Sequence, residues 1–448
     1  MRQNQHKNFF YADKMHAAAE RALELAKKQG ATEAEVAISA GQGFTVRVRR
    51  NEVETVEHQQ GRELAVTVFL GKKKATANTN DLSDSAIKLT VDHAYQNASY
   101  ASEDPYHGLA DPNMLAYDYP DLDLYHPWDI SVQDGVKLAG EYEDLAFTLD
   151  PRITNSEGTT IAVAEGFHLY GNSLGFIGSY PLTSYTVSCS LIVGHGDGMQ
   201  RDGDYTVSCE PNKLLEPSVL VKSAVERTVR RLGASRMPTC NCPVLFSAEV
   251  AQGLFGAFLS AINGYKLYRG ATFLADYLNK QVFSAHVFLE ERPHELRRLS
   301  SVPFDNEGVK KQRRILVDSG ILRGYVLDSY TGRRLNMPTT GNAGGVSNVF
   351  VRTSDNDLNK MLKMMGKGLY ITELLGSGAN IVTGDYSRAA FGFWVENGEI
   401  QRPVCNITVA ANLHDMLKGI VAIGNDIDWR GNIYTGSVLL ENMVIAGQ

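Results

Sequence analysis

The sequence predicts an α+β fold, with helix-flanked antiparallel sheets in the N-terminal half and a β-rich, barrel-like domain with helices at the C-terminal end. Three observations lead to this prediction. Several segments repeat apolar residues every 3.6 positions, as amphipathic helices do. Other segments alternate apolar and polar residues, as half-buried strands do. Asn397-Gly398 lies between two such alternating runs, which is typical of a tight hairpin.

The first hundred residues show both patterns in order. A helix is predicted from the apolar spacing of Met15, Ala18, Ala19, Ala22 and Ala26, with Gly30 at its end. Alternating strands are predicted over 36–38, 44–48 and 64–68, with Gly41-Gln42-Gly43 as a turn between the first two. A second helix is predicted to begin near Asp81 or Ser83.

Composition shifts divide the remaining chain. Residues 101–128 contain four prolines and little periodicity, so they are predicted as an irregular linker between an N-terminal domain (1–100) and a middle α+β domain (129–236). A segment with two cysteines beside prolines, 238–243, is predicted as a second linker. The C-terminal β-rich domain then covers 240–448, and contains predicted helices over 249–262, 358–365 and 412–417.

Bulk properties narrow the class of protein. The 448 residues are 43% hydrophobic and 21% charged, which is ordinary for a globular protein. The formal net charge of −7 argues against nucleic acid as a partner, because there is no positive field to replace phosphate counterions. No apolar run reaches 18 residues, so no membrane span is expected. Five sparse cysteines and the lack of an apolar leader favour reduced thiols and a cytoplasmic location.

Several partial catalytic and metal motifs fall short. Gly171-Asn172-Ser173-Leu174-Gly175 matches the G-x-S-x-G elbow, but strand-like sequence follows it where a helix is needed, so a hairpin turn is favoured. His294-Glu295 lacks the second histidine of a zinc helix. Asp426 to Gly431 begins like a calcium loop but lacks its later ligands, so the acids are expected to accept backbone hydrogen bonds in a turn.

Four further features have ordinary interpretations. Cys240-x-Cys242 lacks the second pair of a zinc ribbon. His195, with acidic residues nearby, could bind a cation, but a solvated hairpin loop is favoured. The basic run 310–314 is predicted to be a solvated face that protects a sheet edge. The glycines of loop 339–345 predict positive φ angles or a close backbone approach, since the Lys-Ser/Thr of a phosphate loop is absent.

Six phrases of the C-terminal segment, in this order, are similar to one known family. They are Pro303-Phe304-Asp305-Asn306-Glu307-Gly308-Val309, Thr340-Gly341-Asn342-Ala343-Gly344-Gly345, Gly368-Leu369-Tyr370-Ile371-Thr372-Glu373-Leu374-Leu375-Gly376, Thr383-Gly384-Asp385-Tyr386-Ser387-Arg388, Gly392-Phe393-Trp394-Val395-Glu396-Asn397-Gly398-Glu399 and Gly424-Asn425-Asp426-Ile427. Together they resemble the TldD/PmbA family of metallopeptidases. The resemblance covers nearly the whole chain and is greatest to the PmbA (TldE) branch.

This resemblance implies a function and a partner. Members of the family pair as a TldD–PmbA heterodimer that degrades or trims flexible peptides, in processes such as maturation of a peptide antibiotic and turnover of an antitoxin. The TldD subunit holds the metal through an H-E-x-x-x-H helix and a later Cys. The expected partners are therefore a TldD-like catalytic subunit and unfolded peptides, with a possible homodimer when the chain is isolated.

The chain departs from the family's metal-binding pattern. The corresponding helix is 253–261, where the two ligand positions and the base position hold Gly256, Ala261 and Ala257. Side chains of Gly and Ala cannot coordinate a cation or accept a proton. The chain is therefore expected to bind no metal and to have no catalytic residue, and zinc or iron is expected in the partner subunit. Leu254, Phe255, Phe258 and Leu259 are predicted to be buried.

Extended peptides could pair with the β-rich domain by strand addition, in which backbone hydrogen bonds give affinity for many sequences. The candidate groove or interface residues are Tyr268, Arg269, Asn342, Gly344, Gly345, Asp385, Ser387 and Arg388. Arg269 and Arg388 could hold a peptide carboxylate. For each residue a turn or a structural hydrogen bond is an equally open interpretation. Two other functions stay open for the chain: a non-enzymatic peptide-binding or chaperone-like module, and an independent hydrolase using Ser173.

Overall fold

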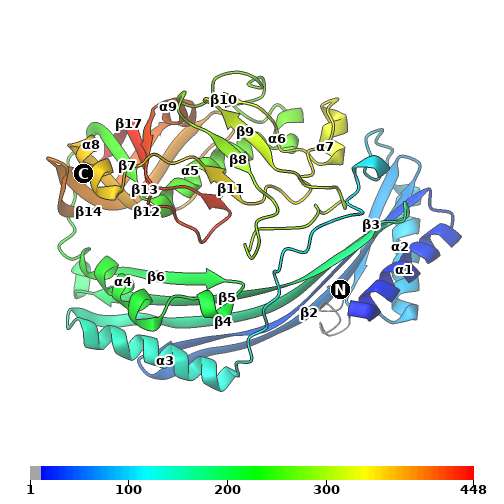
Figure 1. Ribbon diagram of the computed structural model, residues 1–448, viewed down its shortest axis with the longest axis horizontal. Coiled ribbons are helices and arrows are strands. Elements are labelled where there is room, and N and C mark those ends of the chain that lie inside the picture. The colour runs from blue at the N-terminus through cyan, green and yellow to red at the C-terminus, as the bar shows by residue number, and fades with distance from the viewer. Residues whose placement is uncertain (1–11, 448) are drawn as a thin grey trace.

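The computed structural model describes residues 12–447. A long six-stranded sheet and its helices form one layer of the molecule, and the β-rich C-terminal domain lies against the other side of that layer (Figure 1). The predicted α+β class is confirmed. No helix within residues 12–447 is long and apolar enough to cross a membrane.

The two N-terminal helices form where the apolar spacing predicts them. Helix α1 (Ala12–Lys28) buries the five residues named for it, and Gly30 follows with a φ of 100°. Helix α2 (Asp84–Tyr100) begins after Ser83, whose side chain accepts a hydrogen bond from the backbone N–H of Ala86. Such a cap satisfies one of the free N–H groups of a first turn.

Six antiparallel strands form the long sheet, in the order β3-β2-β1-β4-β5-β6. Segments 1–100 and 129–236, predicted as two domains, both contribute strands to it. The strands are β1 (Glu33–Arg49), β2 (Glu52–Leu70), β3 (Lys73–Thr79), β4 (Ile153–Asn172), β5 (Ile177–Val193) and β6 (Gln200–Ser208).

The predicted turn at Gly41-Gln42-Gly43 is wrong, because β1 continues through it. Gly41 pairs with Gly61 and Gly166 on the two neighbouring strands. A Cβ on Gly43 would lie 2.0 Å from the carbonyl oxygen of Val163, so only glycine allows β4 to approach so closely here. The hairpin turn lies instead at Arg50 and Asn51, which both have positive φ.

The two faces of the long sheet differ. Its helix-covered face carries large apolar residues, which pack under α1 and α2 at one end and under α3 (Val132–Leu149) and α4 (Pro217–Val229) at the other. In the middle of the sheet the residues that alternate with them, on what we call the open face, are small or hydroxylated. In register across β1, β4 and β5 they include Gly43, Thr45, Ala162, Ala164, Ser184 and Thr186, all at least half-buried except the exposed Ala164.

One edge of the sheet is uncovered over part of its length. Strand β3 pairs only with Leu64–Leu70 of β2. Within the described chain, residues 52–63 of β2 have no strand on their outer side, and nearly all of them are exposed. We call this segment the free edge of β2.

The linker 101–128 has little regular structure, as predicted, apart from a short 3₁₀ turn at Pro112–Met114. The second predicted linker is wrong in part. Cys240 and Cys242 lie in strand β7 (Cys240–Phe246), which pairs with β17 (Val438–Ala446). All five cysteines are free thiols.

Two further sheets build the C-terminal domain. The larger, in the order β14-β13-β12-β7-β17-β15, is joined by an extra β14–β17 pairing, so that its strands close on themselves as a barrel-like unit. Asn397 and Gly398, with φ of 55° and 75°, form the predicted hairpin between β13 and β14. The larger sheet also contains β12 (Gly368–Leu375), β13 (Asp385–Glu396), β14 (Glu399–Asn412) and β15 (Ile420–Ile423), and the smaller one β8 (Leu289–Glu291), β9 (Arg314–Asp318), β10 (Ile321–Leu322), β11 (Val349–Val351) and β16 (Ile433–Tyr434).

Three helices of this domain form at the predicted positions, and two more form that were not predicted. The segment predicted as helix over 249–262 forms α5 (Ala248–Ala261), and α8 (Leu358–Met365) ends at Gly366, whose φ is 67°. The remaining helices are α6 (Gly264–Tyr268), α7 (Ser329–Arg334) and α9 (Leu413–Lys418).

The basic run 310–314 was predicted to be solvated, and only part of it is. Lys310 and Arg313 are exposed, but Lys311 is 2% exposed and its Nζ lies 3.4 Å from Glu291, which is also buried. Arg314 donates to the same carboxylate at 2.9 Å. A buried carboxylate needs such partners, since an unpaired charge in an apolar interior is costly. The run therefore supplies the counter-ions of Glu291 as well as a surface.

Candidate functional site

Helix α5 is central to the candidate site, because the resemblance predicts it at the position of the family's metal-binding helix. Ser247 caps it by accepting from the backbone N–H of Val250. The predicted burial of Leu254, Phe255, Phe258 and Leu259 is confirmed, with all four between 0% and 7% exposed. Gly253 and Ser260 are exposed on the opposite side of the helix.

The three positions that the resemblance predicts to correspond to the metal ligands and the base carry no ligating side-chain atom. Gly256 is adjacent to β16, since a Cβ built on it would lie 3.8 Å from Cδ1 of Ile433. Ala257 is 9% exposed and Ala261 is fully buried. Within residues 12–447, no three His, Cys, Asp or Glu side chains are arranged to hold a metal ion. The side chains present here do not fit a divalent cation, so no chemical step is assigned to one.

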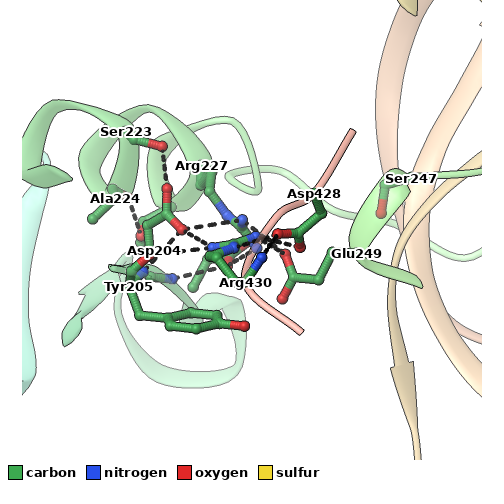
Figure 2. A network of polar contacts seen from close by, with 12 residues as sticks. Asp204, Tyr205, Ser223, Ala224, Arg227, Ser247, Glu249, Asp428 and Arg430 are labelled. Atoms are coloured by element: carbon green, nitrogen blue, oxygen red, sulfur yellow. Dashed lines mark hydrogen bonds and ion pairs between the residues drawn. The ribbon is translucent and has the colours of Figure 1, made fainter. Parts of the chain in front are cut away.

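A cluster of ion pairs lies at the N-terminal end of α5 and joins the middle segment to the C-terminal domain (Figure 2). Arg227 of α4 donates to Glu249 of α5 at 3.0 Å. Arg430 bonds to Asp204 of β6 at 2.6 Å and to Asp428 at 2.8 Å. Burial alone would lower the pKa of Arg430, but the hydrogen bond to Asp428 and the nearby acids raise it above its ordinary value. Both arginines therefore stay charged.

One more pair extends this cluster. Arg231 is 6% exposed and bonds to Glu373 at 2.6 Å and to Asp202 at 3.1 Å. Its guanidinium also lies 3.6 Å from the ring centroid of Phe391. Arginine suits such a site because its planar fork can bond two carboxylates and stack on an aromatic ring.

A cavity of about 440 Å³ opens beside this cluster. It lies between β6 and α4 on one side and α5, β12 and the loop 426–430 on the other. Its lining comprises Asp204, Tyr205, Thr206, Leu215, Arg227, Arg230, Ser247, Ala248, Glu249, Tyr370, Thr372, Asp426, Ile427, Asp428, Trp429 and Arg430. This volume is within the usual range for small-ligand sites.

Three of the predicted groove residues lie on β13, and one of them, Arg388, is adjacent to α5. Asp385 and Ser387 are exposed, and Asp385 accepts a hydrogen bond from Thr383 at 2.7 Å. Arg388 donates to the carbonyl oxygen of Leu374 at 3.2 Å, and its Nη1 would be 3.9 Å from a Cβ on Gly253. Arg388 therefore borders the exposed side of α5.

The other predicted groove residues lie elsewhere. Arg269 is exposed and its Nε donates to the hydroxyl of Tyr268 at 3.1 Å. Asn342 is 4% exposed and its amide donates to Glu291 at 2.9 Å, so for this residue the structural interpretation holds. Gly344 and Gly345 have φ of 92° and 101°, as the loop prediction requires.

The buried carboxylate of Asp305 holds the glycine-rich loop in place, and Glu307 lies two residues after it. Asp305 accepts from the backbone N–H groups of Ala343, Glu307 and Val309. Burial nevertheless raises its pKa to about 6. Burial and the charge of Asp305 raise the pKa of Glu307 to about 7, although Ser329 donates its backbone N–H to this carboxylate.

The partial motifs take the ordinary forms predicted for them. The segment 171–175 is the turn between β4 and β5, and Ser173 accepts a hydrogen bond from the backbone N–H of Ala34. His195 lies in the loop between β5 and β6. Asp428 accepts from the backbone N–H of Arg430, and Asp426 from that of Ser437, which confirms the turn predicted there.

The ion-pair cluster was not predicted as a site. Asp204 and the acids at 426–428 stood out in the sequence, but as candidates for cations. Arg227 and Arg430 gave no signal, since each is a single arginine in an ordinary segment. Only the packing of β6, α4, α5 and the 426–430 loop brings the five side chains together.

Comparison with known proteins now identifies the family. Three family models match the chain in order: PmbA/TldA metallopeptidase domain 1 over residues 34–98, the central domain over 125–232 and the C-terminal domain over 239–447. The chain belongs to the PmbA/TldD metallopeptidase family. It is a PmbA-like member of this family, because it is 46% identical over 427 residues to a metalloprotease PmbA homolog of Haemophilus influenzae, covering 95% of this chain and 94% of that protein.

One further curated relative and two solved structures are also similar to this chain over nearly its whole length. Metalloprotease PmbA of Escherichia coli O157:H7 is 44% identical over 97% of this chain and 96% of its own. A crystal structure from Bacteroides thetaiotaomicron, described as a putative modulator of DNA gyrase, has a TM-score of 0.92 at 25% identity, and covers 98% of this chain and 100% of that one. TldE from Thermococcus kodakarensis shares the fold, with a TM-score of 0.84 at 20% identity over 96% of this chain and 100% of its own.

Proposed function

We propose that this chain is the metal-free subunit of a cytoplasmic two-chain metallopeptidase that acts on unfolded or flexible peptides. A TldD-like partner supplies the zinc or iron and the groups that cleave the peptide bond. The observation that carries this proposal is the content of α5, where Gly256, Ala257 and Ala261 stand at the family's ligand and base positions. None of these side chains can bind a metal or move a proton.

The role of this chain is then to bind and position the substrate. The open face of the long sheet supports that role, because small side chains such as Ala164 and Ser184 leave room for a polypeptide of any sequence. Strand pairing with the backbone would add affinity without side-chain specificity. Arg388 borders α5, and the exposed Asp385 and Ser387 lie on the same strand as further candidate contacts for the peptide or the partner.

Elemental analysis and a cleavage assay test the proposal directly. The purified chain is analysed for zinc and iron, alone and after mixing with a TldD-like partner, and each sample is incubated with an unfolded peptide. The expected result is less than stoichiometric metal and no cleavage for the chain alone, with metal and cleavage both present in the mixture. The matched control is the partner mixed with heat-unfolded chain. Cleavage by the chain alone that a chelator abolishes would contradict the proposal.

A second function fits the same open face: a peptide-binding or chaperone-like module without an enzymatic partner. It predicts peptide binding by the chain alone and no change in turnover when the partner is added. Titration calorimetry with an unfolded peptide, followed by the reconstituted assay, separates the two functions. The third function, a hydrolase based on Ser173, requires that Ser173→Ala abolish activity; the bond that this side chain accepts from Ala34 instead predicts unchanged activity.

A further inference from the structure

The cavity beside the ion-pair cluster contains a polar group that has no partner. Thr372 is 7% exposed, and its buried hydroxyl makes no hydrogen bond. Tyr370 is 5% exposed and lies two residues before it on the same strand. Both residues belong to β12 and both line the cavity. Because buried polar groups are nearly always hydrogen-bonded, the unpartnered hydroxyl of Thr372 indicates that a bound group completes the site.

Arg230 brings a free positive charge to the same cavity. It follows α4 directly and lies with its guanidinium 4.9 Å from the ring centroid of Phe393. Among the described residues it takes part in no ion pair, whereas Arg227 and Arg430, on the same lining, are each bonded to two or more carboxylates. Its donors are therefore available to a ligand.

The acids of the lining are already engaged. Asp204 and Asp428 are bonded to Arg430, and Glu249 to Arg227. Asp426 accepts from both the backbone N–H and the hydroxyl of Ser437. The groups left to receive a ligand are thus donors: the guanidinium of Arg230 and the unpartnered hydroxyl of Thr372, with the hydroxyl of Tyr370 on the same lining.

The start of helix α5 adds to this preference. Ser247 and Ala248 line the cavity, so the positive end of the helix dipole lies at its wall. Four carboxylates nevertheless outnumber three arginines on the lining, so net charge alone cannot attract an anion. Recognition has to come from directed hydrogen bonds to a group that accepts several of them.

We propose that this cavity binds a carboxylate group of a peptide, with Arg230, Thr372 and Tyr370 as its donors. A carboxylate offers two oxygens and about four lone-pair sites, which matches a guanidinium and two hydroxyls. Two sources share this chemistry: the C-terminal carboxylate of a peptide and an Asp or Glu side chain. The proposal rests on the proposed function only in that the ligand is a peptide.

Three short probes test the proposal on the isolated chain by titration calorimetry. They are N-acetyl-trialanine with a free carboxylate, the same peptide as its C-terminal amide, and N-acetyl-Ala-Glu-Ala amide. The free acid is expected to bind at least tenfold tighter than the trialanine amide. If the Glu-containing amide binds as tightly as the free acid, a side chain is the source; if it binds like the trialanine amide, the peptide terminus is.

Variants assign the contacts. Arg230→Gln is expected to weaken binding of the free acid at least tenfold, and Arg230→Lys less. Thr372→Val, which replaces an unbonded hydroxyl with a methyl of the same size, is expected to weaken it by about threefold to tenfold without disturbing the fold. The matched control is Arg323→Gln, which removes another partly exposed arginine far from the lining.

Several results overturn the proposal: absence of binding by every probe, equal binding of acid and amide, or equal affinity in Arg230→Gln and Arg323→Gln. A thermal melt shows whether each Arg230 variant folds. If one does not, the affinity of Thr372→Val for the free acid decides the test. These measurements use neither partner nor metal. The binding proposal can therefore fail while partner-dependent cleavage is observed, and it can hold while no partner-dependent cleavage is observed.

Discussion

The two faces of the long sheet belong to the same strands and have opposite properties. On the helix-covered face of β5, Tyr185, Val187 and Leu191 are at most 1% exposed and pack under α3 and α4. On the open face of the same strand, Ser184, Thr186, Ser188 and Ser190 alternate with them and are only partly buried.

This difference separates stability from binding. Side chains of successive strand residues point to opposite faces, so one strand can carry both properties without conflict. The apolar face supplies the free energy of folding, since burial of each large aliphatic side chain contributes about 1.5–3 kcal/mol. The open face is free of that requirement, and in the middle of the sheet its residues are small and uncharged.

The largest expected effect comes from the covered face. Leu191→Ala should lower the free energy of unfolding by about 2–5 kcal/mol, because it removes buried methyl groups and leaves a cavity. Its matched control on the other face is Ser190→Ala, for which a change within about 0.5 kcal/mol is expected. Urea unfolding followed by circular dichroism measures both. Equal losses in the free energy of unfolding for the two variants would contradict the difference proposed between the covered and the open face.

A pH-dependent effect is expected where the C-terminal domain covers one end of the open face. Asp305 lines a cavity there with Ser39 and His168, and Glu307 follows it in the same loop. The pKa of Glu307 is raised to about 7 from an ordinary 4.5, so the folded chain holds a proton that the unfolded chain has lost. Stability should therefore fall as pH rises through this window, by about 3 kcal/mol.

Glu307→Gln tests this effect, because the amide cannot ionise and can still accept from Ser329. Unfolding in urea should show the variant more stable than the unaltered chain at pH 8 and similar to it at pH 5. Glu399→Gln, at an exposed position, serves as the control and should leave the pH profile unchanged. A Glu307→Gln profile parallel to that of the unaltered chain would mean that another group titrates.

A cross-strand pair sharpens the comparison within a single face. Val46 and Val56 are register partners on β1 and β2, yet Val46 is 0% exposed and Val56 is 45% exposed, because no helix covers β2 at this point. Val46→Ala should cost about 2 kcal/mol and Val56→Ala less than about 0.5 kcal/mol in the same unfolding assay. Similar costs for the two variants would show that coverage by a helix does not decide how much a valine on this face stabilises the fold.

The smallest effect on stability, but a clear effect on activity, is expected on the open face. Ala164→Trp should change the free energy of unfolding by less than about 0.5 kcal/mol, because Ala164 is exposed. If peptides cross this face, the bulky ring should lower partner-dependent cleavage about tenfold, equivalent to about 1.4 kcal/mol. Ala164→Ser is the conservative control. Unchanged cleavage by Ala164→Trp would remove the open face from the substrate path.

The fold could be predicted from the sequence where one segment decides its own structure. The spacing of Met15 to Ala26 was sufficient for α1, and Asn397-Gly398 for its hairpin, since periodicity and turn chemistry are local. The prediction failed at Gly41–Gly43, because these glycines serve the approach of a neighbouring strand more than a hundred residues away. A glycine that turns the chain and one that makes room for another strand look the same in sequence.

The candidate site likewise has a part that could be predicted from the sequence and a part that could not. The absence of ligating side chains at 256, 257 and 261 follows from residue identities alone, and the burial of Phe255 and Phe258 follows from helical spacing. The ion-pair cluster could not be predicted, since Asp204, Arg227, Glu249 and Arg430 come from four elements. Lys311 was taken as solvated for the same reason: its partner, Glu291, lies on another strand.

The free edge of β2 has a consequence for how copies of this chain behave at high concentration. Twelve residues of backbone there could template the strand of another molecule, and Val53 and Val56 are exposed beside them. The segment also carries Glu52, Glu54, Glu57 and Glu63 against a single arginine. Repulsion between these negative charges, instead of a covering helix or a short strand, is thus what disfavours edge-to-edge strand pairing between copies of the chain at the free edge of β2.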